Sequence, residues 1–267
     1  MGKSGFVAIG NANPSNSGLP DLEPPHAAVW LSTTGETWNR LPDEAVFELS
    51  MMNDIATRNG QLVAVGSHRL GTEDRPTAWT SLDGREWSRT ELSSSLGFMY
   101  GVAAGPEGFV AVGSSGRGRL GPTAWLSTDG VTWTAQALDE AAEGVAHEVA
   151  VNESGFVAAG GSAQVDSHGF VWFAPVGGSA EEQSVRADIH GIVATESGFV
   201  GVGSGCTPFG GTALADCPTS SYVVIGFPTA IVRVSQLSAW RLRPLMREDP
   251  ARRRRTSRDE RPRCGRA

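Results

Sequence analysis

The sequence Gly-Phe-Val-Ala-Val-Gly at residues 108–113 decides the fold, because the chain repeats it. Close copies occupy residues 5–10, 61–66, 155–160 and 198–203, so the closing glycines stand 56, 47, 47 and 43 residues apart. A period of about 40–50 residues is typical of propeller blades and of other arrays of one supersecondary unit. The repeat therefore governs how every other feature of the chain is interpreted.

A second motif, two tryptophans on either side of a turn, follows the first three copies. It is Ala-Trp-Leu-Ser-Thr-Asp-Gly-Val-Thr-Trp at residues 124–133, with counterparts at residues 28–38 and 78–87. Asp-Gly between two strand-like runs predicts a hairpin, because Gly accepts a positive φ and Asp tolerates one. With a first strand such as residues 54–57, each unit predicts four short antiparallel strands, the pattern of a propeller blade.

We therefore expect an all-β protein, a β-propeller of four-stranded antiparallel blades with four recognisable blades and part of a fifth. The chain enters the repeat at a second strand, so the first blade lacks its inner strand. We expect an open ring with exposed sheet edges, which favours self-association. The predicted organisation is a blade array over residues 1–228 and an atypical arginine-rich tail over residues 229–267.

The Ser-x-Asp-Gly-x-x-Trp turn resembles the Asp-box of bacterial neuraminidase-type (BNR) repeat propellers, over about residues 5–205. It departs from the family pattern, which usually has one more residue between Asp and Gly. The resemblance implies a sialidase-like fold without sialidase activity, and a structural role for the turns: the carboxylate accepts backbone N–H bonds and the tryptophan packs between sheets. The turn residues concerned are Asp83, Gly84, Trp87, Asp129, Gly130 and Trp133.

The catalytic set of a sialidase is not recognisable in this sequence. There are two tyrosines, Tyr100 and Tyr222, and the nearest match to an Arg-Ile-Pro segment, residues 40–42, follows a turn motif instead of opening a blade. No metalloprotease helix, nucleophile elbow or phosphate-binding Gly-Lys-Ser/Thr motif occurs. A two-carboxylate glycosidase stays open, because its acids have no set sequence spacing. We assign no catalytic residue and no cofactor.

The repeat register brings polar residues of four blades to one position near the start of the first strand. The residues at this position and the next that form the candidate central-channel binding site are Asn53, Asp54, Tyr100, His147, Glu148 and His190. First strands line the channel of a propeller, so these side chains are expected to converge. Two interpretations remain: a water-filled polar channel, or a ligand pocket. Two histidines and two carboxylates suit a transition metal, but the metal stays unknown.

Charge divides the chain into two unlike parts. Residues 1–240 hold 11 Lys and Arg against 25 Asp and Glu, so we expect the body to bind no nucleic acid. Residues 241–267 hold 11 arginines against 4 acids and no lysine. We interpret the tail as disordered or non-native, such as a GC-rich gene translated out of frame; the alternative is a polyanion-binding tail.

Cysteines and apolar runs indicate the compartment. Cys206 and Cys217 enclose ten residues, which predicts a disulfide, with a metal pair as the alternative. A disulfide favours a secreted or cell-envelope location for the full-length form, although no signal peptide is recognisable. No run of 18 apolar residues occurs, so no membrane span is expected.

These features predict a non-catalytic binding or scaffolding module that presents one face to a protein or glycan. A different class, a sialidase-like glycoside hydrolase with carboxylates at the central channel, is the alternative. A third interpretation is a truncated remnant without an independent function. The sequence does not identify the ligand.

Overall fold

The protein consists of consecutive antiparallel β-sheets, each made of strands that follow one another in the chain. The computed structural model describes residues 5–12, 26–92, 95–140, 143–162, 169–185, 188–196, 198–205, 220–227 and 230–234. All of them belong to a compact unit that spans Met1–Gln236.

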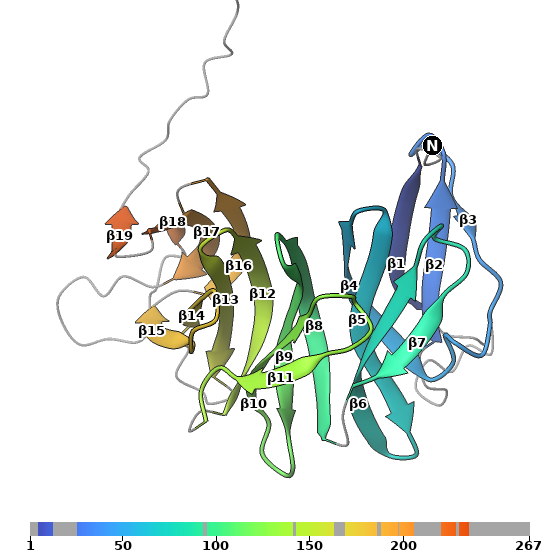
Figure 1. Cartoon of the computed structure of the whole chain (residues 1–267), viewed down its shortest axis with the longest axis horizontal. Helices are drawn as coiled ribbons and strands as arrows, with labels where there is room; N and C mark the ends of the chain where they lie inside the picture. The colour runs from blue at the N-terminus through green and yellow to red at the C-terminus, as the bar shows by residue number, and fades with distance from the viewer. Residues whose placement is uncertain are drawn as a thin grey trace, which may run out of the picture. The chain divides into compact units, whose positions relative to one another are not determined.

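The described residues of this unit form five sheets, here called blades 1 to 5 (Figure 1). Blade 1 contains β1 (Phe6–Ala12), β2 (His26–Ser32) and β3 (Asn39–Arg40). Blade 2 contains β4 (Ser50–Arg58), β5 (Gln61–Leu70), β6 (Glu73–Ser81) and β7 (Ser88–Glu91). Blade 3 contains β8 (Leu96–Gly105), β9 (Gly108–Gly116), β10 (Gly121–Ser127) and β11 (Thr134–Ala137).

The last two blades repeat the four-stranded order. Blade 4 contains β12 (Gly144–Asn152), β13 (Gly155–Ser162), β14 (Gly169–Pro175) and β15 (Glu181–Val185). Blade 5 contains β16 (Asp188–Thr195), β17 (Gly198–Gly205), β18 (Ser220–Phe227) and β19 (Ala230–Val234). The predicted all-β propeller of four-stranded blades is confirmed, with a first blade of three strands. Strand β19 lies beyond residue 228, where we placed the end of the blade array, and it completes the sheet of blade 5.

In blades 2 to 4 the repeated Phe-Val-Ala-Val strand is the second strand of its blade and is buried on both faces. In β9, Val110 and Val112 belong to the apolar cluster shared with blade 4. Phe109 and Ala111 alternate with them and belong to the cluster shared with blade 2. Successive residues of a strand point to opposite faces, so a continuous apolar run is what a sheet covered on both sides requires.

A tryptophan on the third strand fills the interface between blades 1 and 2, between blades 2 and 3 and between blades 3 and 4. Trp79, Trp125 and Trp172 are almost completely buried, and each pairs across the ladder with an alanine of the second strand. The small alanine side chain leaves room for the indole ring beside it. Each of these three rings packs onto the valine face of the preceding blade. The fourth interface, between blades 4 and 5, is an apolar cluster without tryptophan, in which Phe199 packs with Val157 and Val171.

The two end faces of this row expose apolar side chains. Phe6 of blade 1 is 55% exposed, and Trp30 is half-buried although its counterpart Trp79 is fully buried. On blade 5, Val202 is 50% exposed, whereas Val65 and Val112 at the same position of blades 2 and 3 are completely buried. Burial of the tryptophan and valine positions therefore depends on a neighbouring blade.

Among the described residues, no helix is long and apolar enough to cross a membrane.

Candidate functional site

The candidate channel residues occupy one recurring irregularity of the inner strands. The register of each inner strand against its second strand shifts by one residue at the same place in blades 2 to 5. The extra residues of these four β-bulges are Asn53, Tyr100, His147 and His190. A bulge turns the side chain of its extra residue away from the regular alternation.

The bulge also explains the glycine that closes each Phe-Val-Ala-Val strand. A Cβ atom added to Gly66 would lie 1.8 Å from the carbonyl oxygen of Met51, and one added to Gly113 would lie 1.9 Å from that of Phe98. The inner strand can come this close to the second strand only because the residue at this position has no Cβ atom. The repeated glycine is therefore needed for the close backbone approach at the bulge.

Two of the six candidate side chains bind the backbone of the next blade. Asn53 Nδ2 donates to the Met99 carbonyl oxygen at 2.7 Å. The carboxylate of Asp54 accepts the Val102 N–H at Oδ2 and the Ile55 N–H at Oδ1, both at 2.8 Å. Asn53 and Asp54 thus join the inner strands β4 and β8 by side-chain hydrogen bonds.

Three of the candidate residues, Asp54, Glu148 and His190, interact electrostatically. Burial raises the pKa of the Asp54 carboxyl, and its two backbone hydrogen bonds oppose that rise. Burial also raises the pKa of Glu148; the charge of Asp54 adds to the rise and His190 opposes it. Carboxylates from blades 2 and 4 and a histidine from blade 5 therefore share one local field.

Tyr100 belongs to a different environment. Its ring stacks on Phe98 with ring centres 6.0 Å apart. Burial raises the pKa of the Tyr100 hydroxyl, and the negative charge of Asp74 on the outer part of blade 2 raises it further. The charge that acts on Tyr100 is thus that of Asp74, whereas the charges that act on Glu148 are those of Asp54 and His190. Among the described residues, no group of three or more His, Cys, Asp or Glu side chains could hold a metal ion.

The Trp-anchored turns, residues 32–38, 81–87 and 127–133, share one hydrogen-bond pattern. In the third, Gly130 N donates to Ser127 Oγ at 2.8 Å, and Trp133 Nε1 donates to the Gly130 carbonyl at 3.0 Å. Asp129 Oδ1 accepts the N–H groups of Val131 at 2.8 Å and Thr132 at 2.7 Å. These bonds lower the pKa of Asp129 to about 2.

The turn of blade 2 repeats these bonds, and the turn of blade 1 changes one of them. Asp83 Oδ1 accepts two backbone N–H groups, which lower its pKa, and Trp87 Nε1 donates to the Gly84 carbonyl at 3.0 Å. In blade 1, Thr34 stands where the aspartate would be, and its Oγ1 accepts a single N–H. Gly84 has a positive φ of 73° and lies against side chains of blade 1, so the turn also contributes to the interface.

Cys206, Cys217 and the tail from residue 235 onward lie outside the described residues.

Sequence reasoning missed a pocket at the outer part of blade 3. It has a volume of about 340 Å³ and is lined by Ser115, Arg119, Gly121, Pro122, Thr123, Ala137, Asp139, Glu140 and Glu143. Ser115 Oγ and Thr123 Oγ1 are 3.0 Å apart, and Thr123 Oγ1 donates to the Gly121 carbonyl at 3.0 Å. Glu143 forms an ion pair with Arg119 at the rim.

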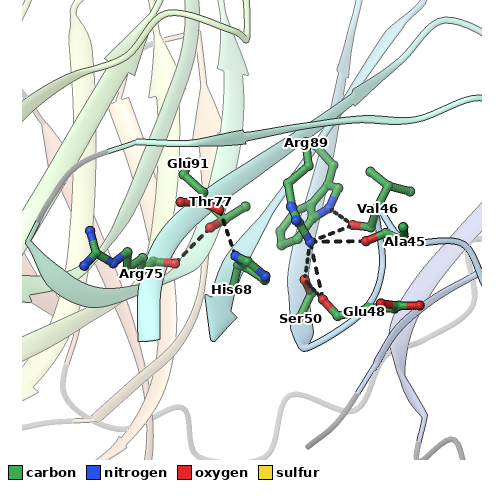
Figure 2. Close-up of polar contacts among 10 residues, drawn as sticks. Ala45, Val46, Glu48, Ser50, His68, Arg75, Thr77, Arg89 and Glu91 are labelled. Atoms are coloured by element: carbon green, nitrogen blue, oxygen red, sulfur yellow. Dashed lines mark hydrogen bonds and ion pairs between the residues drawn. The ribbon is translucent and has the colours of Figure 1, made fainter. Parts of the chain in front are cut away.

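Blade 2 fills the same position with its own side chains. The ladders place His68 opposite Arg75, and Ser115 opposite Gly121 at the equivalent place in blade 3. Figure 2 shows His68 beside Glu91, with 2.9 Å between Nδ1 and Oε1.

Ala137 occupies the place of Glu91 in blade 3, opposite Thr123 as Glu91 is opposite Thr77. Three large polar residues of blade 2 are thus replaced by serine, glycine and alanine in blade 3. An alignment of the repeats carries this signal, although strand prediction alone does not.

Figure 2 also shows how Arg89 of β7 holds the segment that links blades 1 and 2. Its Nη1 atom lies 3.3–3.5 Å from the carbonyl oxygens of Ala45, Val46 and Glu48 and from Ser50 Oγ. The Trp79 indole N–H donates to the same Val46 carbonyl at 2.9 Å. Arg89 is therefore a structural residue.

Comparisons with known proteins give the fold and no more. No family model matches the chain, and no curated protein matches it. Kuenenia stuttgartiensis Hydrazine Synthase is similar in structure, with a TM-score of 0.54 and 10% identity over 80% of this chain and 62% of that one. YCF48 bound to D1 peptide is similar with a TM-score of 0.46 and 16% identity, over 76% of this chain and 57% of that one.

Bombyx mori GH32 beta-fructofuranosidase BmSUC1 has a TM-score of 0.44 and 12% identity over 89% of this chain and 61% of that one. In all three comparisons this chain spans less than two thirds of the matched chain. At such identities the likeness concerns the all-β propeller architecture, and function has to be argued from the residues.

Proposed function

We propose that this protein is a non-catalytic propeller that presents a face to a protein or glycan partner. The observation that carries the proposal is the bonding of Asp54. A general acid or a nucleophile needs a carboxyl that can reach substrate, whereas both oxygens of Asp54 accept backbone N–H groups. This carboxylate joins blades 2 and 3, which supports a rigid scaffold.

Glycoside hydrolysis is the second candidate, and one observation favours it. Asp54 and Glu148 interact electrostatically, and burial raises the pKa of both. A glycosidase uses two carboxyl groups, of which the acid has a raised pKa. In this alternative, Glu148 would be the acid and Asp54 the ionised partner.

The two candidates differ in what Asp54 does, and replacement tests them. Under the scaffold proposal, Asp54→Ala leaves the buried Val102 N–H without its partner and lowers the free energy of unfolding by about 1–3 kcal/mol. Glu148→Gln serves as the matched control and leaves stability nearly unchanged. Both are measured by urea unfolding, alongside release of nitrophenol from a panel of nitrophenyl glycosides.

The scaffold proposal expects no glycoside turnover that depends on these carboxylates. Hydrolysis by the wild type that Asp54→Asn and Glu148→Gln each abolish, with the fold intact by circular dichroism, would overturn it in favour of the glycosidase. An unchanged stability of Asp54→Ala would likewise contradict the structural role of this carboxylate.

The exposed end faces support self-association as a further property. Inside the row, a tryptophan face of one blade packs on a valine face of the preceding blade. Blade 1 exposes a tryptophan face with Phe6, and blade 5 exposes a valine face with Val202. A second copy of the chain would therefore dock its blade 1 on blade 5 of the first, and this head-to-tail contact would continue the interface already used between blades.

A further inference from the structure

The pocket of blade 3 differs from the same place in blade 2 because three of its lining positions carry small residues. Ser115, Gly121 and Ala137 stand where blade 2 has His68, Arg75 and Glu91. Blade 1 has His26 at the position of Arg75, so blades 1 and 2 both place a nitrogen-rich side chain there. In blade 4, Phe170 takes the position of Thr123 and stacks on Trp172 with ring centres 5.8 Å apart.

The side chains that fill the equivalent place in blade 2 indicate what kind of ligand group would fit the pocket of blade 3. The side chain of His68 is 8% exposed, and its Nδ1 atom lies beside the Glu91 carboxylate (Figure 2). Next to it, the guanidinium of Arg75 pairs with Glu73 at 3.0 Å. Planar nitrogen groups beside a carboxylate therefore occupy the position that is hollow in blade 3.

The lining of the pocket offers acceptors to such a group. Thr123 donates its hydroxyl proton to the Gly121 carbonyl, so its oxygen and that of Ser115 present lone pairs. At the rim, Asp139, Glu140 and Glu143 outnumber Arg119, the one cationic residue among the lining residues. A guanidinium has five donors and no acceptor, which matches hydroxyl and carboxylate oxygens.

We infer that the pocket of blade 3 binds the guanidinium group of an arginine side chain supplied by a protein partner. The inference rests on the proposed binding function and names its partner class. A protein-borne arginine suits the site better than free arginine, because the carboxylate of the free amino acid would lie close to the acidic rim. Three carboxylates against one guanidinium also disfavour phosphorylated or otherwise anionic ligands.

A peptide titration tests the pocket. The probes are acetylated, amidated pentapeptides of glycine with a central arginine or a central citrulline, which keeps the shape and removes the charge. Binding is followed by the ¹⁵N–¹H shifts of Ser115 and Thr123 in the full chain. We expect a Kd of the order of 1 mM for the arginine peptide, as suits one side chain, and at least tenfold weaker binding of citrulline.

The filled state of blade 2 supplies the matching variant. Ser115→His combined with Ala137→Glu installs the pair that occupies blade 2, and it should abolish the shifts caused by the arginine peptide. Glu140→Gln should weaken binding about twofold to fivefold, because one exposed rim charge is lost. Thr134→Ser, outside the lining residues, is the control and should bind as the wild type. Circular dichroism confirms that each variant is folded.

The outcomes separate this inference from the proposed function. Equal binding of citrulline, unchanged binding by the Ser115→His and Ala137→Glu variant, no shifts at all, or shifts confined to Asp54 and Glu148 would each overturn the pocket assignment and leave the scaffold role standing. Binding of free arginine as tight as that of the peptide would overturn the protein source. Carboxylate-dependent glycoside hydrolysis would instead overturn the proposed function.

Discussion

Blade 1 and blade 2 carry the same tryptophan motif in different surroundings. Trp79 of blade 2 is completely buried and Trp87 is 8% exposed, because both pack on the valine face of blade 1. In blade 1 the corresponding Trp30 is half-buried, and Trp38 is 43% exposed. Both turn tryptophans still donate to the carbonyl of the turn glycine, at 3.1 Å in blade 1 and 3.0 Å in blade 2.

This difference separates two roles of one motif. The hydrogen bonds of the turn are local and form in each copy, whereas burial of the rings needs a preceding blade. Apolar burial is the dominant favourable term in folding, so the tryptophans of blade 2 stabilise the protein more than those of blade 1. The same comparison predicts how three substitutions rank.

The largest effect is expected for the tryptophan of the third strand. Trp79→Ala removes a fully buried ring and leaves the Val46 carbonyl without its indole donor, so it should lower the free energy of unfolding by about 3–5 kcal/mol. Trp30→Ala, the matched variant of blade 1, should cost roughly half as much or less. Urea unfolding monitored by circular dichroism measures both. Equal costs would show that a preceding blade does not determine the contribution of this position.

A smaller effect, limited to acid pH, is expected for the turn carboxylate of blade 3. The native pKa of Asp129 is about 2, below its ordinary value of 3.8. Because the folded state lowers this pKa, the ionised carboxylate contributes stability above about pH 4, and this contribution is lost as the pH falls toward 2. The stability difference between wild type and Asp129→Asn should therefore be constant above pH 4 and shrink below it.

Blade 1 supplies the converse variant for this prediction. Thr34→Asp places a carboxylate where blades 2 and 3 have one, and it should add an acid-dependent contribution with the same sign. Unfolding free energies measured between pH 2 and pH 6 compare the two variants. A difference that stays constant down to pH 2 for Asp129→Asn would contradict the assignment of the pKa to the turn hydrogen bonds.

The smallest effect on unfolding is expected at the exposed end face. Phe6→Ser should change the unfolding free energy by about 0.5 kcal/mol or less, because the ring already lies largely in water. The same variant should weaken association between copies, as should Val202→Ser on the opposite end face. Sedimentation velocity over a hundredfold concentration range measures the association. A wild type that remains monomeric throughout, or a loss caused by only one of the two variants, would argue against head-to-tail contact.

The equivalence of the four bulge residues could be predicted from the repeat register alone. The alignment identified Asn53, Tyr100, His147 and His190 as equivalent, and the structure places each of them at the same bulge. What the alignment lacked was the direction of each side chain. Asp54 accepts a hydrogen bond from the backbone of blade 3, and Tyr100 interacts electrostatically with Asp74, because bulge geometry and the packing of adjacent sheets decide these directions.

The pocket of blade 3 shows the opposite case. Its lining residues Ser115, Gly121 and Ala137 are small residues of common types, and strand prediction does not single them out. They form a hollow only because strands β9, β10 and β11 bring them side by side in the ladder. The pocket exists because these positions lack large side chains, and it is recognised by comparison with blade 2, where large side chains fill the same place.

By itself, the sequence determined the repeat, the strand order within each blade and the turns between strands. These features depend on residues a few positions apart: alternating apolar side chains, a glycine that allows close backbone approach, and a serine and an aspartate that bind nearby N–H groups. The tertiary structure alone decided which tryptophans are buried, which carboxylates share a field and where a pocket remains. Those properties depend on contacts between blades about 47 residues apart, as the bonds from Arg58 to Gly105 and from Asp54 to Val102 illustrate. Burial and electrostatic coupling are set by the neighbours that packing provides.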